Sequence, residues 1–269
     1  MHLHNEANMC TLIVLKDVFE KYPLVVASNR DENPKRPSAP PLFWFDDPEI
    51  YAPRDLVRGG TWIGVNRQGV IAALTNLDTV AHRRGCKSRG QLLVEMLDLG
   101  AADQVDRLLA GDIDNVGEFG STREPYNLPV EYNGLNLVVA DSECCTLLVN
   151  DGNSTKITRL GSGAHIITGY GVGPDHAPRA SEITRRLRDI KDPSPEGLDK
   201  LLNFHADGRP EAAACVHDPN EYHKTISSMI VRADRNWTRF ETWFRAGPAC
   251  SGPFDERFDV EFRKNGSES

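Results

Sequence analysis

The stretch NMCTLIVLKDVFEKYPLVVASNRDENPKRP, residues 8–37, contains two apolar runs joined by a short polar segment. CTLIVL begins at Cys10, and YPLVVAS follows after KDVFEK. Runs rich in β-branched and aliphatic residues predict strands, and a connection this short predicts a hairpin. If the turn is centred near Glu20, residues whose numbers sum to about 40 face each other, so Cys10 lies beside Arg30. The sequence therefore predicts a thiol next to a guanidinium, flanked by the carboxylate of Asp31.

Composition and charge limit the class of protein. The 269 residues are 39% hydrophobic and 26% charged, which suits one large globular domain or two small ones with a sizeable core. The net charge of −8 argues against nucleic acid or an acidic membrane as a partner. No apolar run approaches the ~20 residues that a membrane helix needs. The first eight residues lack a secretory signal, and the six cysteines show no disulfide framework, so we expect a cytoplasmic protein.

Strand-like runs outnumber helical patterns along the chain. The expected strands are 10–17, 23–29, 61–66, 69–75, 135–141, 144–150, 155–160, 164–168, 211–217, 225–233 and 238–244. The expected helices are 88–100, 101–111, 178–190 and 194–206. Hairpin-linked strands and paired helices predict an α+β fold with two mainly antiparallel sheets and helices outside them. We expect residues 10–254 to form a single domain, residues 1–9 to be a leader or a misassigned start, and residues 255–269 to be a polar tail.

Other constellations are weaker candidates for a functional site. RGGTWIGVNRQG, residues 58–69, lacks the strand–turn–helix context of a phosphate loop, so its glycines predict close backbone approaches. CVHD, with Cys215 and His217, and the nearby His223 are a candidate metal set, but strand alternation turns the first two toward one, usually packed, face. We therefore predict no metal site and no cofactor. The basic stretch HRRGCKSR, residues 82–89, is expected to be a solvated loop.

Cys10 is the strongest candidate for chemistry. A cysteine in an apolar strand is most often a small buried hydrophobe, and NRDE followed by prolines is also consistent with a polar strand exit. Two features favour catalysis instead. Cys10 follows Met9, and cysteine is small enough for methionine removal to leave it as the N-terminus. AALTN ends another strand at the amide of Asn76, which is a candidate oxyanion donor.

A set of motifs runs in order from about Met9 to Phe254, nearly the whole chain. The motifs are MCTLIVL, YPLVVASNRDE, GGTWIGVN, GVIAALTN, SRGQLL, YNGLNLVVAD, HKTISSMIV and GPACSGPF. Together they resemble the NRDE family, the transport-and-Golgi-organisation protein type. The resemblance implies the N-terminal-nucleophile (Ntn) hydrolase fold, a four-layer αββα sandwich, and a relationship to cysteine-type penicillin V acylases and bile-salt hydrolases. In such enzymes a strand begins at the catalytic residue, whose α-amine acts as the base.

The resemblance further implies an amidohydrolase that cleaves a C–N bond other than a peptide bond through a Cys10 thioester. Arg30 would favour the thiolate, and Asp31 would hold the α-amine that takes the thiol proton and later donates it to the leaving amine. Asn76 would donate to the oxyanion. The expected substrate contacts are Asn29, Asn136 and Trp62, with Tyr51, Phe119 and Tyr126 as further aromatic candidates for the pocket. The expected partner is a small-molecule amide or acyl ligand, and a homo-oligomer is left open.

Two departures from the family pattern leave alternatives open. Nine residues precede Cys10, so a free amine requires either a true start at Met9, which we favour, or removal of the leader. Relatives often carry asparagine where HIITGYG has Gly169, so hydrolysis would depend on Asn136 or a backbone N–H in its place. A non-catalytic protein that binds a lipid, haem or another small ligand therefore stays open. So does an acyltransferase, in which an amine or thiol replaces water at the thioester.

Overall fold

The structure is a computed structural model and describes residues 10–44, 49–99, 102, 127–217 and 222–262. Some sequence-based expectations lie outside these residues. They are the leader 1–9, almost all of the helix 101–111, and the aromatic candidates Phe119 and Tyr126.

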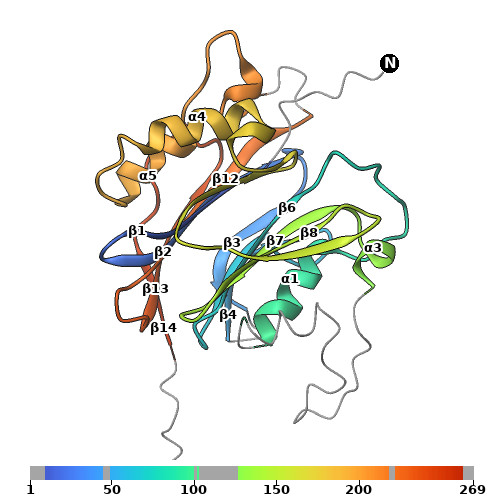
Figure 1. Cartoon of the computed structure of the whole chain (residues 1–269), viewed down its shortest axis with the longest axis horizontal. Coiled ribbons are helices and arrows are strands. Elements are labelled where there is room, and N and C mark those ends of the chain that lie inside the picture. Colours follow the sequence, from blue (N-terminus) through green and yellow to red (C-terminus); the bar gives the residue numbers. More distant parts are fainter. Residues whose placement is uncertain (1–9, 45–48, 100–101, 103–126, 218–221, 263–269) are drawn as a thin grey trace, which may run out of the picture.

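Two seven-stranded antiparallel sheets form the centre of the molecule (Figure 1). Across the first sheet the order is β11 (Gly171–Val172), β10 (Gly163–Thr168), β1 (Thr11–Phe19), β2 (Tyr22–Glu32), β12 (Lys224–Ala233), β13 (Arg239–Ala246) and β14 (Phe258–Glu261). Across the second it is β3 (Ser38–Phe43), β4 (Ile50–Asp55), β5 (Ile63–Asn66), β6 (Ile71–Asn76), β7 (Leu135–Ala140), β8 (Cys145–Asn150) and β9 (Thr155–Arg159).

Helices cover the outer faces of both sheets (Figure 1). The outer side of the first sheet carries α4 (Pro178–Leu187) and α5 (Pro195–Leu202), and the second carries α1 (Arg89–Asp98) and the short α3 (Leu128–Glu131). Two 3₁₀ turns, η1 (Pro174–His176) and η2 (Pro210–Ala212), flank the α4–α5 pair in the chain. The expected four-layer αββα sandwich is confirmed.

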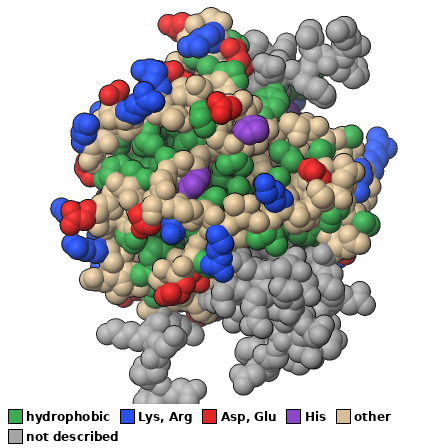
Figure 2. All heavy atoms as spheres, viewed as in Figure 1, with side chains coloured by type: hydrophobic (Ala, Val, Ile, Leu, Met, Phe, Trp, Pro, Cys, Tyr) green, Lys and Arg blue, Asp and Glu red, His purple; other side chains and the backbone are tan. Residues whose placement is uncertain are grey.

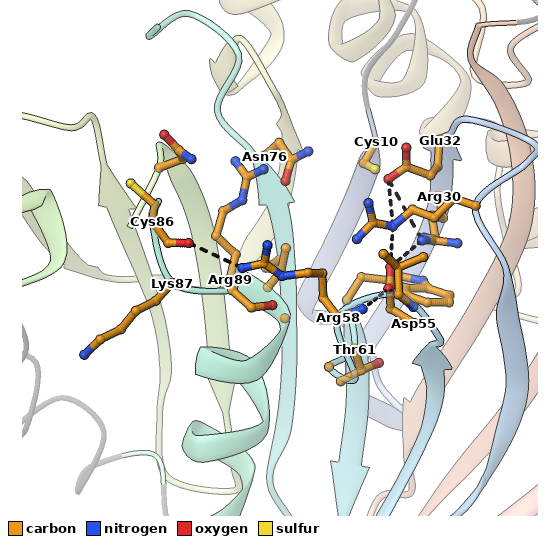
Figure 3. A pocket seen from close by; sticks show the side chains of 18 of the residues that line it. Cys10, Arg30, Glu32, Asp55, Arg58, Thr61, Asn76, Cys86, Lys87 and Arg89 are labelled. Atoms are coloured by element: carbon orange, nitrogen blue, oxygen red, sulfur yellow. Dashed lines mark hydrogen bonds and ion pairs between the residues drawn. The ribbon is translucent and has the colours of Figure 1, made fainter. Parts of the chain in front are cut away.

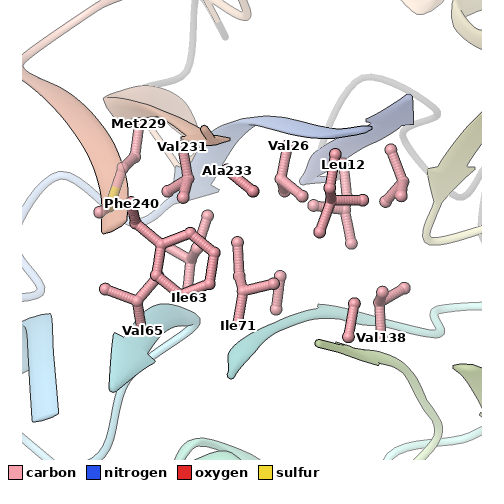
Figure 4. Close-up of a cluster of buried hydrophobic side chains, with 14 of the residues drawn as sticks. Leu12, Val26, Ile63, Val65, Ile71, Val138, Met229, Val231, Ala233 and Phe240 are labelled. Carbon is pink, nitrogen blue, oxygen red and sulfur yellow. The ribbon is translucent and has the colours of Figure 1, made fainter. Parts of the chain in front are cut away.

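Strand alternation distributes the apolar side chains among the layers. On β1, Leu12 and Val14 point into the core between the sheets, which Figure 4 shows, whereas Ile13 and Leu15 pack beneath α4 and α5. A third cluster fills the space between the second sheet and α1. Each central strand is therefore buried on both faces, which explains the near-continuous apolar runs in its sequence.

The register expected for the first hairpin is confirmed. Thr11 pairs with Asn29 and Lys16 with Leu24, so the paired numbers sum to 40 along this stretch. The register shifts by one before Phe19 pairs with Tyr22, near Asp17, whose φ of 54° lies in the left-handed region. The start of β1 therefore lies beside the NRDE end of β2.

One expected strand is wrong. Residues 211–217 do not form a strand, because Pro210 starts the turn η2 and only His217 makes an isolated bridge, to Lys224. Pro210 has no N–H to donate, and the alanines after it lack the alternation of a strand.

Four strands lie where no strand was expected: the two-residue β11, and β3, β4 and β14. β3 carries prolines at 40 and 41, which argue against a strand in the sequence. It lies at the edge of its sheet, where a residue without a backbone N–H to donate is tolerated. β4 contains Pro53 and pairs with this edge. β14 lies within the expected polar tail and pairs with β13.

The described surface and helices add two constraints. On the face in Figure 2, acidic and basic side chains are interspersed around its outline, with hydrophobic side chains between them, so this face has no continuous basic surface. Among the described helices, none has the length and apolar character needed to cross a membrane.

Candidate functional site

A cavity of about 360 Å³ opens where β1 begins and where β2, β4 and β6 end. Five of the residues selected from the sequence line it: Cys10, Arg30, Asp31, Asn76 and Trp62. Figure 3 shows Cys10 and Arg30 on one side of the cavity and Asn76 on the other, so the fold brings the proposed nucleophile and oxyanion donor to one cavity.

The alternation of β2 separates the four residues of the NRDE motif. Val26 faces the core between the sheets, and Arg30 and Glu32 continue that face into the cavity. The side chains of Asn29 and Asp31 point to the opposite face of β2. There Asn29 hydrogen-bonds to α5 and Asp31 to α4. Half of the motif therefore faces the cavity, and half anchors the helices.

Burial dominates the protonation of the Cys10 thiol. Sγ donates to the backbone carbonyl of Asp31 at 3.5 Å. Burial, reinforced by the negative charge of Asp31, raises the pKa of this thiol to about 12. Arg30 acts in the expected direction and lowers the pKa, but its effect is smaller. Cys10 is therefore a protonated thiol at neutral pH, and its use as a nucleophile requires a base.

Arg30 is buried and only partly satisfied. Its Nη2 donates to Oδ2 of Asp55 at 3.0 Å, and its guanidinium carbon lies 4.2 Å from the ring centre of Trp62. Its Nη1 is buried and has no hydrogen-bond partner among the described residues. A buried charged donor without a partner is unfavourable, because it has lost its water. Arg30 as a residue lines the cavity.

Asp55 holds Arg30 in position. Its Oδ2 also accepts from Nε of Arg36 at 2.6 Å, and its Oδ1 accepts from the backbone N–H groups of Val57 and Arg58, each at 2.9 Å. Burial alone would raise the pKa of Asp55, but the hydrogen bonds from Arg36 and from the backbone of Arg58 hold it below its ordinary value. The carboxylate is therefore ionised and fixes both the turn after β4 and the guanidinium of Arg30.

The carboxylate of Asp31 is fully buried and bound to protein groups. Oδ2 accepts from Nη1 of Arg179, at the start of α4, at 3.0 Å, and Oδ1 accepts from the hydroxyl of Thr225 at 2.6 Å. Burial raises the pKa of Asp31 to about 6, against the opposing effect of Arg179. An α-amine on Cys10 would have to compete with these two partners for the carboxylate.

Two expected substrate contacts lie away from the cavity. The amide of Asn29 is fully used, because Nδ2 donates to the carbonyls of Leu202 and Ala214 and Oδ1 accepts from Ser228. Asn136 faces the space between the sheets, where its Nδ2 donates to Thr75 and Thr168. Neither asparagine lines the cavity. Strand alternation and the meeting of the two sheets give both amides structural partners, so a contact with substrate stays a prediction that this cavity does not support.

Gly169, which stands where relatives often have asparagine, joins the two sheets through its backbone. Its carbonyl accepts from the N–H of Asp78 at 2.9 Å, just beyond the end of β6. Gly169 does not line the cavity. The cavity itself contains two other asparagines, Asn76 and Asn133.

Arginines from loops form much of the remaining wall. The stretch 82–89, expected to be solvated, lies along the cavity. Arg89 donates to the carbonyl of Gly134 at 2.7 Å, and Arg58 donates to the carbonyl of Cys86 at 3.4 Å. No strand or helix periodicity marks the residues before Arg89, because they lie in turns, and Arg89 itself is the first residue of α1. Their basic clustering is the one signal that the sequence offers.

The charge of Arg89 is incompletely solvated. Burial lowers the pKa of this guanidinium, and the carboxylate of Asp78 acts on it in the opposite direction. Lys87, two residues earlier, points away from the other labelled side chains in Figure 3 and pairs with Glu131. Both residues line the cavity, but the ammonium of Lys87 is held by Glu131, whereas Arg89 donates only to a backbone carbonyl among the hydrogen bonds of the described residues.

Two glycines fix where α1 begins. A Cβ on Gly60 would overlap the backbone of Gly90, and a Cβ on Gly90 would lie 2.8 Å from the carbonyl oxygen of Thr61. The N–H of Thr61 donates to the carbonyl of Gly90 at 3.2 Å, and Ser88 caps the helix. This close backbone approach, expected for the glycine-rich stretch, places Arg89 at the cavity.

The sequence model of the Transport and Golgi organisation 2 (TANGO2) family matches residues 9–245 of this chain. The chain belongs to this family. The resemblance seen in the NRDE motif set is thereby confirmed. The bovine Transport and Golgi organization protein 2 homolog is 32% identical over 123 residues, which are 45% of this chain and 39% of the bovine protein. The human homolog is 33% identical over 123 residues, which again are 45% of this chain and 39% of the human protein. The match therefore spans about two fifths of the length of these TANGO2 relatives.

Solved structures show where else the fold of this TANGO2 chain occurs. A variant of the conjugated bile acid hydrolase from Clostridium perfringens has a TM-score of 0.50 and 11% identity, covering 97% of this chain and 99% of that chain. The Caenorhabditis elegans N-acylethanolamine-hydrolyzing acid amidase ortholog has a TM-score of 0.46 and 10% identity, covering 82% and 92%. The likeness to the bile acid hydrolase concerns the fold alone, which is the Ntn-hydrolase-like αββα sandwich.

Proposed function

We propose that this protein is an Ntn-type cysteine amidohydrolase acting on a small amide that carries an anionic group. The observation that carries the proposal is the cavity, in which the Cys10 thiol at the start of β1 lies with the unsatisfied guanidinium of Arg30 and a wall of arginines. Asn76 is the proposed oxyanion donor, and Trp62, stacked on Arg30, is the proposed apolar wall for the acyl group.

The proposed reaction uses the α-amine of Cys10 as the base. As Sγ attacks the amide carbon, the S–C bond forms, the amine takes the thiol proton and the carbonyl oxygen becomes an oxyanion. Collapse of this intermediate breaks the C–N bond, and the ammonium gives its proton to the leaving amine. Water then hydrolyses the thioester, which releases the acid and restores the thiol.

The thiol pKa constrains this mechanism. Burial raises the pKa of the thiol above the ~8 of an α-amine, so proton transfer from the thiol to the amine is uphill before the substrate is attacked. The thiolate would thus not accumulate before attack, and proton transfer is expected to be concerted with formation of the S–C bond. A substrate that displaces water near Arg30 and brings its carbonyl to Asn76 would help by stabilising the negative charge as it moves to oxygen.

The anionic group follows from the charges on the cavity wall. The hydrogen bonds of Arg58, Arg83 and Arg89 go to backbone carbonyls, which carry no net charge. By contrast, the guanidinium of Arg36 is paired with Asp55. Three guanidinium groups around one cavity favour a carboxylate or phosphate, because arginine binds both through paired N–H donors.

The test is a matched pair of substrates. N-acyl glycines and the corresponding N-acyl ethanolamides share the scissile amide and differ in the terminal carboxylate. Protein expressed from Met9, so that methionine removal exposes Cys10, is expected to hydrolyse the glycine series with the higher kcat/KM. Cys10→Ala should abolish release of the acid, whereas Cys86→Ser, in the same cavity, should retain it. Equal activity in Cys10→Ala, or preference for the neutral series, would refute the proposal.

A second candidate is a binding protein without turnover. The raised pKa of the Cys10 thiol favours this candidate, because such a thiol is a poor nucleophile without a base. Calorimetry with the same N-acyl glycines distinguishes the two functions. Binding that is unchanged in Cys10→Ala, with no acid released by protein that begins at Cys10, would support the binding protein.

A further inference from the structure

A second cluster of reactive side chains lies apart from the cavity. It consists of His205, Cys215, His217 and Cys250, none of which lines the cavity. Two imidazole nitrogens and two sulfurs, one ligating atom from each residue, all lie within 4.8 Å of one another. Nε2 of His217 is 3.4 Å from Sγ of Cys215 and 3.3 Å from Sγ of Cys250.

These separations fit tetrahedral coordination. With Zn–S bonds of ~2.3 Å and Zn–N bonds of ~2.0–2.1 Å, the edges of the tetrahedron measure ~3.3–3.8 Å. Two cysteines and two histidines are a set that structural zinc sites use, and four protein ligands leave no open position for a substrate. We propose that His205, Cys215, His217 and Cys250 form a structural zinc site.

Backbone hydrogen bonds bring the first ligands together without a metal. The N–H groups of Ala214 and Cys215 both donate to the carbonyl of Phe204, at 3.2 and 3.1 Å, so Cys215 lies beside His205. Nδ2 of Asn29 donates to the carbonyl of Ala214 at 2.9 Å, which ties this segment to β2. The protein thus pre-organises this half of the site, which lowers the entropy lost on binding an ion.

The fourth ligand comes from the turn after β13. Cys250 lies in a turn in which the N–H of Ser251 donates to the carbonyl of Pro248 at 2.9 Å. Gly247, with a φ of 91°, redirects the chain into this turn, and its N–H donates to the carbonyl of Ile226. The turn is therefore fixed against the start of β12, close to the segment that holds Cys215.

The chemistry of the donors suits a divalent ion. Zinc would displace one proton from each cysteine and bind two thiolates and two neutral imidazoles, giving a centre without net charge. Cys215 is buried and the other three residues are exposed, so the ion can reach the site from solvent.

Zinc here would also stabilise a segment next to the catalytic candidates. The N–H of Val216, between two ligands, donates to Oγ1 of Thr225 at 2.9 Å, and that hydroxyl donates to the carboxylate of Asp31 at 2.6 Å. Ordering of the segment by zinc is therefore expected to stabilise the anchoring face of the NRDE motif.

The sequence concealed this set. The sequence groups Cys215 and His217 with His223 on an expected strand, 211–217, that the structure does not contain. The irregular backbone after η2 directs both side chains to one point, and the fold supplies His205 and Cys250 in place of His223. Spacing alone does not reveal such a site, because its members come from three separate segments.

The test measures zinc in the full chain purified without a polyhistidine tag and with reductant present. Elemental analysis is expected to find about one zinc per chain, falling below about a tenth of that in Cys215→Ser and Cys250→Ser. Cobalt(II) added to the zinc-free protein should give thiolate-to-metal charge-transfer absorption and intense tetrahedral d–d bands. Cys86→Ser and His165→Gln, which change residues outside the cluster, should retain both signals.

Cys250 is exposed, so its serine variant is expected to fold and keeps the proposal testable. Zinc should raise the Tm of the wild-type chain but not that of Cys250→Ser. Three outcomes would overturn the proposal: no zinc in the wild type, zinc retained by both cysteine variants, or a disulfide between Cys215 and Cys250 in reduced protein. Loss of zinc in Cys10→Ala alone would place the metal in the cavity and would also overturn it.

Discussion

The Cys10 thiol in the full-length chain is expected to exchange slowly with small disulfides at neutral pH. With a pKa of about 12, its thiolate fraction at pH 8 is ~10⁻⁴, against ~10⁻¹ for a thiol with the ordinary value of 9.0. The more basic thiolate is intrinsically more nucleophilic, and a Brønsted coefficient of ~0.45 returns a factor of ~20 over three pKa units. The net expectation is exchange roughly 50-fold slower than that of a reference cysteine peptide.

The assay follows disulfide exchange at Cys10 by peptide-resolved mass spectrometry between pH 7 and 10, with the reference peptide in the same tube. The rate should rise about tenfold per pH unit without a plateau, while circular dichroism confirms that the chain stays folded. Arg30→Gln should lower the rate further, because Arg30 lowers the thiol pKa. Arg185→Gln, which removes an exposed arginine on α4, is the matched control. A plateau below pH 9, or an unchanged profile in Arg30→Gln, would refute this account of the thiol.

Three further predictions follow from contacts around the cavity and the motif. Arg89→Gln should weaken binding of an N-acyl glycine by about 10- to 100-fold in calorimetry, because it removes a charge-assisted contact, whereas Arg185→Gln, on α4 and outside the cavity, should change it less than about threefold. Gly90→Ala should lower the free energy of unfolding by about 2 kcal/mol in urea titrations, because its Cβ would crowd the neighbouring backbone, whereas Gly161→Ala has open space and should be tolerated. Asn29→Ala should lower it by about 3 kcal/mol, because it leaves two buried carbonyls and a hydroxyl without their partner. A destabilisation below about 1 kcal/mol would contradict this role of Asn29.

The sequence was most informative where local rules control structure. The turn near Glu20 gave the register of the first hairpin, and that register places Cys10 beside Arg30. Alternation along β2 also predicts the direction of the Asn29 side chain. Val25 and Ala27, four and two residues earlier, face the helices, so Asn29 points to the same side. The error there was to treat neighbouring polar residues as one group, although successive side chains point to opposite faces.

The remaining features depend on contacts between distant segments. The basic loop before α1 becomes a cavity wall only because Gly60 and Gly90 let two backbones meet. Asn136 is an interior residue because Thr168, on the other sheet, provides a carbonyl within reach of its amide. Neither partner follows from a local pattern, so composition and periodicity could not identify these roles.

The two faces of the NRDE motif connect the parts of this protein. Arg30 and Glu32 face the cavity, where charge and an unsatisfied donor suit a ligand, and Asn29 and Asp31 bind the α4–α5 layer and its loops. These four residues lie on one continuous strand, so one element holds both the cavity face and the helix-binding face. The motif can therefore be needed both for the fold and for the ligand. Variants of the two faces should distinguish these roles. Substitutions of Asn29 and Asp31 should lower the free energy of unfolding, and substitutions of Arg30 should change ligand binding and the reactivity of the Cys10 thiol.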